Sequence, residues 1–330
     1  MRIRFQPWQF ALVVVAFCAG VIALVHWRSN RIYTPQQLLS LLPSDHAVLA
    51  YLDTAALRES GVLDLLSGTR NAEEPEYRRF VEQTGFDYRI DLDAVAASLT
   101  PDTRYFVLRG TFRWKQLAAY AISQGGTCQY TVCSMSGSTE ARSISFFPLK
   151  PNVLALAVSP DPRAVVNISS TTRSNQHMTD GPLWALIPAA MLSQLDTARS
   201  PLPDGLRPLA APLAQAHELT ISVHPNANVA RDVLPGPLAG LVPAGDWNVE
   251  LQIAAASPEQ AASVAKQISS LTSTLNTGLA TGMKNGEKNT AGQGLGRLLS
   301  SARVQQLGST VSMTLPVDRA WLENLASPAP

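Results

Sequence analysis

The longest apolar run in the chain lies near its N-terminus, at residues 10–27. His26 is the only polar side chain among these eighteen residues. As a helix rising about 1.5 Å per residue, the run spans roughly 27 Å, which is close to the hydrocarbon thickness of a bilayer. Trp8 and Trp27 flank it, and indole rings favour the headgroup level of a membrane. The run therefore predicts a transmembrane helix that places the chain in a lipid bilayer.

The flanks of this run favour an uncleaved anchor over a removed leader. A cleaved signal peptide has a shorter apolar core followed by a small-x-small site, and the residues after Trp27 contain no such site. A lipoprotein would need a small residue before its modified cysteine, but Phe17 precedes Cys18. The basic tail before the run resembles a signal-peptide n-region. We therefore expect residues 1–32 to form a cytoplasmic tail and a single-pass anchor in the cytoplasmic (inner) membrane, with an extracytoplasmic body.

Beyond the anchor, strand-like and helix-like patterns alternate. Residues 46–52 predict a strand, and Asp53 or Thr54 is placed to cap the helix after it. Residues 104–110 predict a second strand that leads into an amphipathic helix over 113–124. The other elements expected in the first half are a brief helix over 38–42, helices over 74–84 and 94–99, strands over 127–133, 142–149 and 153–158, and a short helix after residue 159.

The second half repeats this order. Strands are expected over 218–223 and 247–253, and the segment Ser257–Gln260 is a capping box with proline at the first helical position. The remaining elements expected are the long helix after this box, a Gly/Lys/Asn loop over 282–296, a hairpin over 302–306 and 309–315, and a final helix capped by Asp318. Both halves thus show strands, caps and helices in similar order.

These patterns predict an α+β fold in which the transmembrane helix is followed by two lobes of antiparallel sheet with flanking helices. We place the first lobe at 33–170 and the second at 217–330. The segment 171–216 between them is expected to be a proline-rich connection, since eight prolines fall in residues 200–243 and limit regular structure there.

Composition and charge narrow the class of protein. Apolar residues are 46% and charged residues 15% of the chain, so a folded core is expected. The formal charge is +1; without Arg2 and Arg4, which precede the anchor, residues 28–330 carry 24 basic against 25 acidic side chains, or −1. A near-neutral body argues against a nucleic-acid-binding groove.

Cys128 and Cys133 are five residues apart on one expected strand, so their side chains should point to opposite faces. A disulfide would need a turn between them, and Gln-Tyr-Thr-Val is a poor turn sequence. We therefore expect two separately packed thiols. A zinc site lacks a second cysteine pair or a nearby histidine.

His217 and His224 also fall on opposite faces of their strand, which argues against a two-histidine metal site. Asp87, Asp91 and Asp93 form the densest carboxylate cluster. Calcium is conceivable there, but the turn glycine and closing glutamate of an EF-type loop are absent. We expect Asp91 or Asp93 to cap the helix over 94–99 instead, and we assign no catalytic, cofactor-binding or metal-binding residue.

Three segments of the first half carry a family resemblance. They are residues 42–53, Phe80–Asp93 (Phe-Val-x-x-Thr-Gly-Phe-Asp-Tyr-x-x-Asp-Leu-Asp) and 110–112 (Gly-x-Phe). Over about residues 40–160 the chain resembles N-terminally membrane-anchored bacterial envelope proteins with a TGFDYxxDLD-type motif, a family without a known activity. The resemblance implies an envelope location and supplies no catalytic residue.

Together these features favour a non-enzymatic envelope protein that binds or scaffolds another envelope component, such as a protein partner. Two alternatives stay open. One is a hydrolase or other enzyme built around Asp87, Asp91 and Asp93, and the other is a small-ligand binder that uses a cleft between the lobes.

Overall fold

The computed structural model describes residues 33–63, 75–137, 139, 141–168, 181–193, 209–225, 247–284, 298–299 and 301–317. The expected anchor, the helix after Asp318, most of the Gly/Lys/Asn loop and most of the proline-rich connection lie outside these residues. None of the helices within the described ranges combines the length and apolarity that a membrane span requires.

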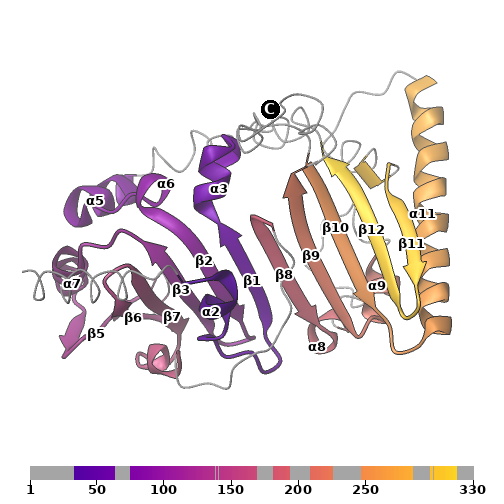
Figure 1. The fold of residues 1–330 in the computed structure, drawn as a ribbon. Coiled ribbons are helices and arrows are strands. Elements are labelled where there is room, and N and C mark those ends of the chain that lie inside the picture. Colours follow the sequence, from indigo (N-terminus) through magenta and orange to yellow (C-terminus); the bar gives the residue numbers. More distant parts are fainter. Residues whose placement is uncertain are drawn as a thin grey trace, which may run out of the picture.

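The strands of the described residues form one twelve-stranded antiparallel sheet, in the order β11-β12-β10-β9-β8-β1-β2-β3-β7-β6-β5-β4 (Figure 1). Their bounds are β1 Val48–Asp53, β2 Leu92–Leu99, β3 Arg104–Gly110, β4 Thr127–Gln129, β5 Val132–Ser136, β6 Ser143–Lys150, β7 Val153–Ser159, β8 Leu183–Pro188, β9 Glu218–Pro225, β10 Trp247–Ala254, β11 Arg303–Leu307 and β12 Thr310–Val317. The predicted α+β class with an antiparallel sheet is confirmed. Both halves share the sheet, because β8 pairs with β1 on one side and β9 on the other.

The helices of these residues are α2 Pro35–Leu39, α3 Thr54–Glu59, α5 Pro75–Thr84, α6 Tyr88–Asp91, α7 Trp114–Ser123, α8 Ala189–Leu192, α9 Ala210–Ala214 and α11 Pro258–Lys284, with a 3-10 turn η1 at Ala164–Asn167. Several begin as the sequence predicts. The Asp53 side chain accepts a hydrogen bond from the Ala56 backbone at 2.9 Å and so caps α3. The Ser257 hydroxyl accepts from the Gln260 backbone at 3.2 Å at the start of α11.

Two layers of helices cover the sheet on opposite faces. Neighbouring strand residues point to opposite sides, and in β7 Val153 packs under α2 and η1 whereas Leu154 packs under α7. In β8, Leu186 belongs to the same cluster as Val153, whereas Ile187 packs against the cluster under α11. Helices α7 and α11 therefore cover one face, and α2 and η1 cover the other.

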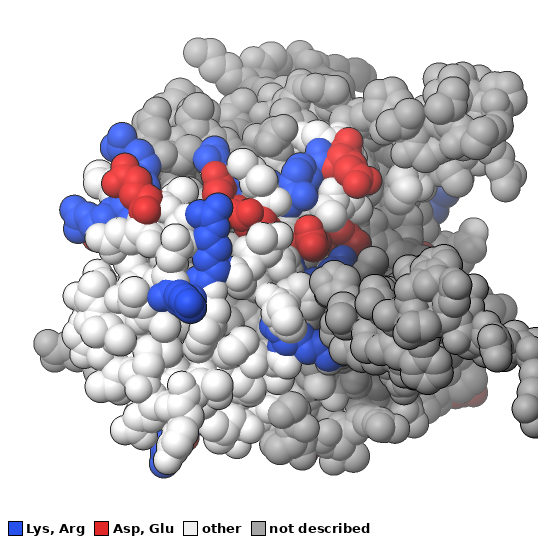
Figure 2. Space-filling model, turned by 60° about the vertical axis from the view of Figure 1, so that its left-hand side comes forward, with Lys and Arg blue, Asp and Glu red and all other residues white. Residues whose placement is uncertain are grey.

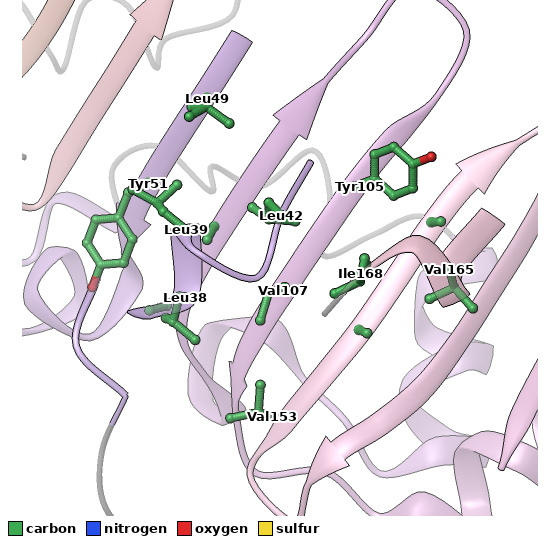
Figure 3. Close-up of a cluster of buried hydrophobic side chains, with 14 of the residues drawn as sticks. Leu38, Leu39, Leu42, Leu49, Tyr51, Tyr105, Val107, Val153, Val165 and Ile168 are labelled. Carbon is green, nitrogen blue, oxygen red and sulfur yellow. The ribbon is translucent and has the colours of Figure 1, made fainter. Parts of the chain in front are cut away.

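The cluster under α2 and η1 is the main core of the first half. Figure 3 shows leucines of α2 and the turn after it lying over side chains of β1, β3 and β7. Its fully buried members include Leu38, Leu42, Leu49 and Val107. Each such leucine, once removed from water, contributes roughly 2 kcal/mol of hydrophobic stabilisation.

Three expected elements are wrong. The helix predicted over 94–99 is the strand β2, in which Ala94 and Ala96 pack in the cluster under α2 and η1 while Ala97 is buried on the opposite face. Strand β8 lies in the segment interpreted as a connection, because its prolines fall at the strand ends, Pro182 just before it and Pro188 as its last residue. The single strand predicted over 127–133 is the hairpin β4–β5. Packing on both faces thus overrides local propensity.

Candidate functional site

The carboxylate of Asp87 is held by hydrogen bonds from its own neighbourhood. It caps α6 and accepts from the Tyr77 hydroxyl at 2.8 Å, the Arg89 backbone at 2.9 Å and the Arg89 guanidinium at 2.8 Å. The hydrogen bonds from Arg89 lower the pKa of Asp87 to about 2. Burial, followed by the hydrogen bond to Asp87, raises the pKa of Tyr77. A carboxylate with this many donors is stabilised in its charged form.

Asp91 and Asp93 occupy different surroundings. The Asp91 carboxylate accepts from the Asp87 backbone at 2.8 Å, and the Asp91 carbonyl accepts from the Thr111 backbone at 2.8 Å. Asp93 lies in β2 at a bulge in the pairing with β3. The prediction that Asp91 or Asp93 caps a helix over 94–99 is wrong, because that segment is a strand. No set of three or more His, Cys, Asp or Glu side chains in the described residues is arranged to hold a metal ion.

The segment Thr84–Leu92 joins the outer helices to the sheet. Arg58 of α3 donates from its guanidinium to the carbonyls of Arg89 and Leu92, both at 2.5 Å. Gly110 at the end of β3 packs so closely on Asp91 that a Cβ atom there would lie 2.1 Å from the Asp91 carbonyl oxygen. In this segment, the residues that carry the family resemblance therefore make contacts that hold α3 and the end of β3 against the start of β2.

The lowered pKa of Asp87 predicts a specific loss of stability in acid. Its folded pKa of about 2 lies below the ordinary 3.8, so the contribution is full above pH 3.8 and disappears as the pH falls through 2. At 14% exposure of its side chain, this shift corresponds to about 2 kcal/mol. We expect Asp87→Asn to lower the free energy of unfolding at pH 7 by this amount and to flatten its dependence between pH 4 and 2.

Urea denaturation of the two proteins across this pH range is the measurement. Asp102→Asn is the matched control, because Asp102 is exposed in the turn between β2 and β3. Equal pH profiles for the parent protein and Asp87→Asn would contradict the role given to the Arg89 hydrogen bonds.

His217 and His224 each make contacts within the sheet. The His224 ring lies 2.9 Å from the Ser222 hydroxyl on the same face of β9, and His217 precedes β9 with its backbone bonded to the Ala254 carbonyl at 2.7 Å. The contacts of both residues are those of sheet packing.

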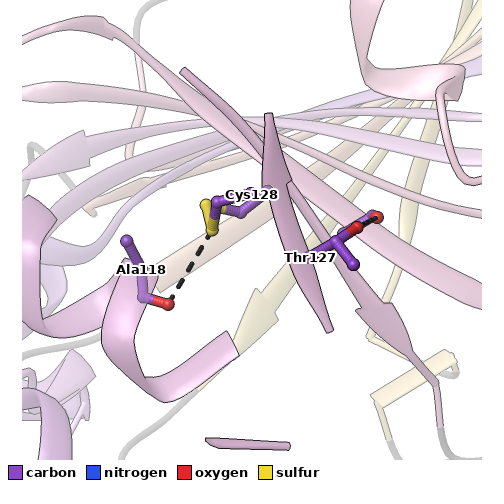
Figure 4. Close-up of a disulfide and its surroundings, with 5 residues drawn as sticks. Ala118, Thr127 and Cys128 are labelled. Atoms are coloured by element: carbon purple, nitrogen blue, oxygen red, sulfur yellow. Dashed lines mark hydrogen bonds between the residues drawn. A yellow bond between two sulfur atoms is a disulfide. The ribbon is translucent and has the colours of Figure 1, made fainter. Parts of the chain in front are cut away.

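Cys128 and Cys133 form a disulfide, so the prediction of separate thiols is wrong (Figure 4). The two cysteines lie on different strands and are directly paired across the β4–β5 hairpin, with Cα atoms 4.0 Å apart. The turn between them contains Tyr130 at a φ of +55°, a backbone conformation that non-glycine residues seldom adopt. The prediction failed because it excluded a turn on residue preference alone. Cys128 Sγ also lies 3.8 Å from the Ala118 carbonyl of α7.

Reduction of this disulfide is expected to destabilise the body by about 2 kcal/mol, the chain-entropy value for a closed loop of six residues. The measurement is the urea midpoint with and without dithiothreitol. Cys128→Ala/Cys133→Ala is the control, since its midpoint should be insensitive to reductant. Alkylation of both cysteines in unreduced protein would show that the bond is absent.

A pocket of about 350 Å³ lies at the end of the sheet where β3, β6 and β7 meet. It is lined by Phe112, Trp114, Pro148, Lys150, Pro151, Val153 and Leu154. The first two come from the junction between β3 and α7, and the others come from the end of β6, the turn after it and the start of β7. The lining contains one charged side chain and no carboxylate, imidazole, thiol or hydroxyl group.

Aromatic contacts fix the walls of this pocket. The Phe112 ring stacks on Phe86 with centroids 5.3 Å apart and planes at 18°, and the Trp114 and Phe146 rings form a T-shaped pair with centroids 5.7 Å apart. Lys150 Nζ lies 4.3 Å from the centre of the Tyr33 ring, and Arg109 donates to the Tyr33 carbonyl at 3.0 Å. The pocket therefore adjoins the point where the described chain begins.

Sequence reasoning missed this pocket. The pattern Phe-Arg-Trp after β3 and the pattern Pro-Leu-Lys-Pro around the β6–β7 turn are visible in the sequence, but only the pairing of β3 with β7 brings them together. Figure 2 shows acidic and basic side chains intermixed on the upper part of one side of the molecule, with few charges on the surface below. This side of the molecule therefore has no large patch made of acidic side chains alone or of basic side chains alone.

Comparisons with known proteins give a remote likeness. No protein-family model matches the chain, and no curated protein matches it. Crystal forms III, I and IV of TP0453 match with TM-scores of 0.44, 0.40 and 0.43, at 11%, 10% and 10% identity. They cover 90% of this chain, which in turn covers 98%, 97% and 97% of theirs. At these scores the likeness carries no conclusion about function.

Proposed function

We propose that this chain is a bacterial envelope protein, anchored in the inner membrane by residues 10–27, that binds another envelope component without catalysing a reaction. Its body is extracytoplasmic, and its two α+β halves, 33–170 and 217–330, are joined through β8 in one sheet. The apolar run and the resemblance of Phe80–Asp93 to anchored envelope proteins support this location. The Cys128–Cys133 disulfide supports it independently, since such bonds persist in oxidising compartments.

The composition of the pocket is the observation on which binding rests. Ligand sites are concave and mostly apolar with few polar groups, and the aromatic, proline and aliphatic lining with Lys150 fits that description. General acid–base or nucleophilic catalysis needs a positioned proton acceptor or an activated nucleophile. Asp87 and Asp91 are engaged in local hydrogen bonds, which favours binding over the enzyme alternative.

A photocross-linking residue in place of Trp114 tests the binding function in full-length protein in native membranes. We expect a defined adduct from position 114 and none from the matched position Lys266, which is exposed on α11 in the other half. Identical products from both positions, or hydrolase turnover that Asp93→Asn abolishes, would overturn the proposal.

The anchor is tested separately by alkaline carbonate extraction and by a phosphatase fused after residue 330. Retention in the membrane pellet and an active phosphatase are expected. Release into the soluble fraction, or a reporter active only in the cytoplasm, would contradict the location.

A further inference from the structure

The pocket lies within reach of the membrane that the anchor would occupy. Tyr33 follows Trp27, the last residue of the apolar run, by six positions. A fully extended chain of this length spans at most about 20 Å. Because Lys150 Nζ lies 4.3 Å from the Tyr33 ring, only this short length of chain would separate the pocket from the anchor.

The same end of the sheet carries side chains suited to a bilayer interface. The register Cys133 with Phe146 places the β4–β5 turn beside the end of β6, so the fully exposed Tyr130 projects at the same end as Pro148. Trp114 and Phe112 line the pocket there. Aromatic rings concentrate at membrane interfaces, where one part of the ring is in apolar and another in polar surroundings.

The charge of the pocket lining indicates which class of lipid it would bind. Lys150 is the one charged residue of the lining, and an ammonium group near an anionic membrane surface attracts acidic headgroups. The remaining lining offers only carbon surface and ring faces, which suit an acyl chain.

We propose that the pocket binds an anionic phospholipid of the anchoring bilayer, with its phosphate on Lys150 and the upper part of an acyl chain against Phe112 and Trp114. This inference rests on the proposed membrane anchor. It identifies the envelope component of the proposed function as a lipid. A protein segment in the same pocket is the alternative, and the absence of Trp114 quenching by lipid would favour it.

The test uses full-length protein in vesicles of phosphatidylcholine with increasing fractions of phosphatidylglycerol, brominated or not on its acyl chains. The contribution of Trp114 is the difference in tryptophan fluorescence between the parent protein and Trp114→Phe. We expect brominated phosphatidylglycerol to quench this contribution. Lys150→Glu should raise the fraction needed for half-maximal quenching by more than about fivefold, because fivefold is the effect of losing one lysine at an anionic surface and the glutamate adds a repelled negative charge. Lys266→Glu, an equal charge change on α11, should leave it unchanged.

The remaining tryptophans separate the two possible failures. In Trp114→Phe combined with Trp321→Phe, quenching reports Trp8 and Trp27 of the anchor, because the other two tryptophans, Trp184 and Trp247, are buried in the body. If Trp8 and Trp27 are quenched while the Trp114 contribution is not, the lipid inference is overturned and the anchor stands. If Trp8 and Trp27 are not quenched, the anchor and the inference both fall. A Trp114 contribution quenched equally by brominated phosphatidylcholine, with no effect of Lys150→Glu, would also overturn the assignment of an anionic lipid.

Discussion

Gly110→Ala is expected to lower the free energy of unfolding by about 3 kcal/mol, in the range seen when a new group is forced into a closely packed position. The added Cβ would lie 2.1 Å from the Asp91 carbonyl oxygen and 3.1 Å from Leu92 Cα. Both are backbone atoms, and the Asp91 carbonyl also accepts a hydrogen bond from Thr111. Relief of the contact therefore requires β3 to separate from the start of β2.

Urea denaturation followed by circular dichroism measures this loss. Gly308→Ala is the control, because Gly308 lies in the β11–β12 turn at a φ of +58° with no atom within 4 Å of the added Cβ. It should lose about 1 kcal/mol from the left-handed backbone alone. A Gly110→Ala protein as stable as this control would contradict the close approach of β3 to Asp91.

Trp184→Ala is expected to lower the free energy of unfolding by about 4 kcal/mol, as is typical of deleting a large aromatic side chain from a core. Trp184 is fully buried and lies on β8, the strand that links the two halves of the sheet. Its ring packs in the same cluster as Leu49 and Tyr51 of β1. The cavity left by alanine would therefore lie at the junction of the halves.

Trp184→Phe distinguishes the contribution of the aromatic ring to stability from that of the indole N–H group. The Trp184 indole nitrogen is buried and has no hydrogen-bond partner. Phenylalanine removes this unsatisfied donor while it retains most of the ring, so we expect a loss of about 1 kcal/mol. Equal losses for the two variants, again from urea denaturation, would show that the indole N–H is satisfied in solution.

Elements whose pattern is local were predictable from the sequence. The helix α7 has a continuous apolar stripe, Asp53 is a strong cap, and β12 alternates apolar and polar residues after its turn. In contrast, β2 has an alanine-rich sequence that suits a helix, and only the layers above and below it make a strand favourable. Strand β8 is defined by its pairing with β1, more than 130 residues earlier in the chain.

The site depended even more on tertiary structure. Asp87 belongs to a carboxylate cluster visible in the sequence, and its ion pair with Arg89 is local, but its hydrogen bond to Tyr77 requires α5 and α6 to be placed together. The pocket requires residues 112–114 and 148–154 to meet through the pairing of β3 with β7. Neither arrangement leaves a periodic pattern in the sequence.

The short spacing of Cys128 and Cys133 has a consequence for how the protein is made. Four residues separate them, whereas β6, the next strand to join this hairpin, begins ten residues after Cys133. If the chain is exported from its N-terminus, the thiols can meet and be oxidised before β6 has crossed the membrane. The third cysteine, Cys18, belongs to the apolar run and would be in the bilayer by then. An isomerase would therefore not be needed to rearrange a wrong disulfide. The covalently closed β4–β5 hairpin would then offer the edge of β5 to which β6 pairs.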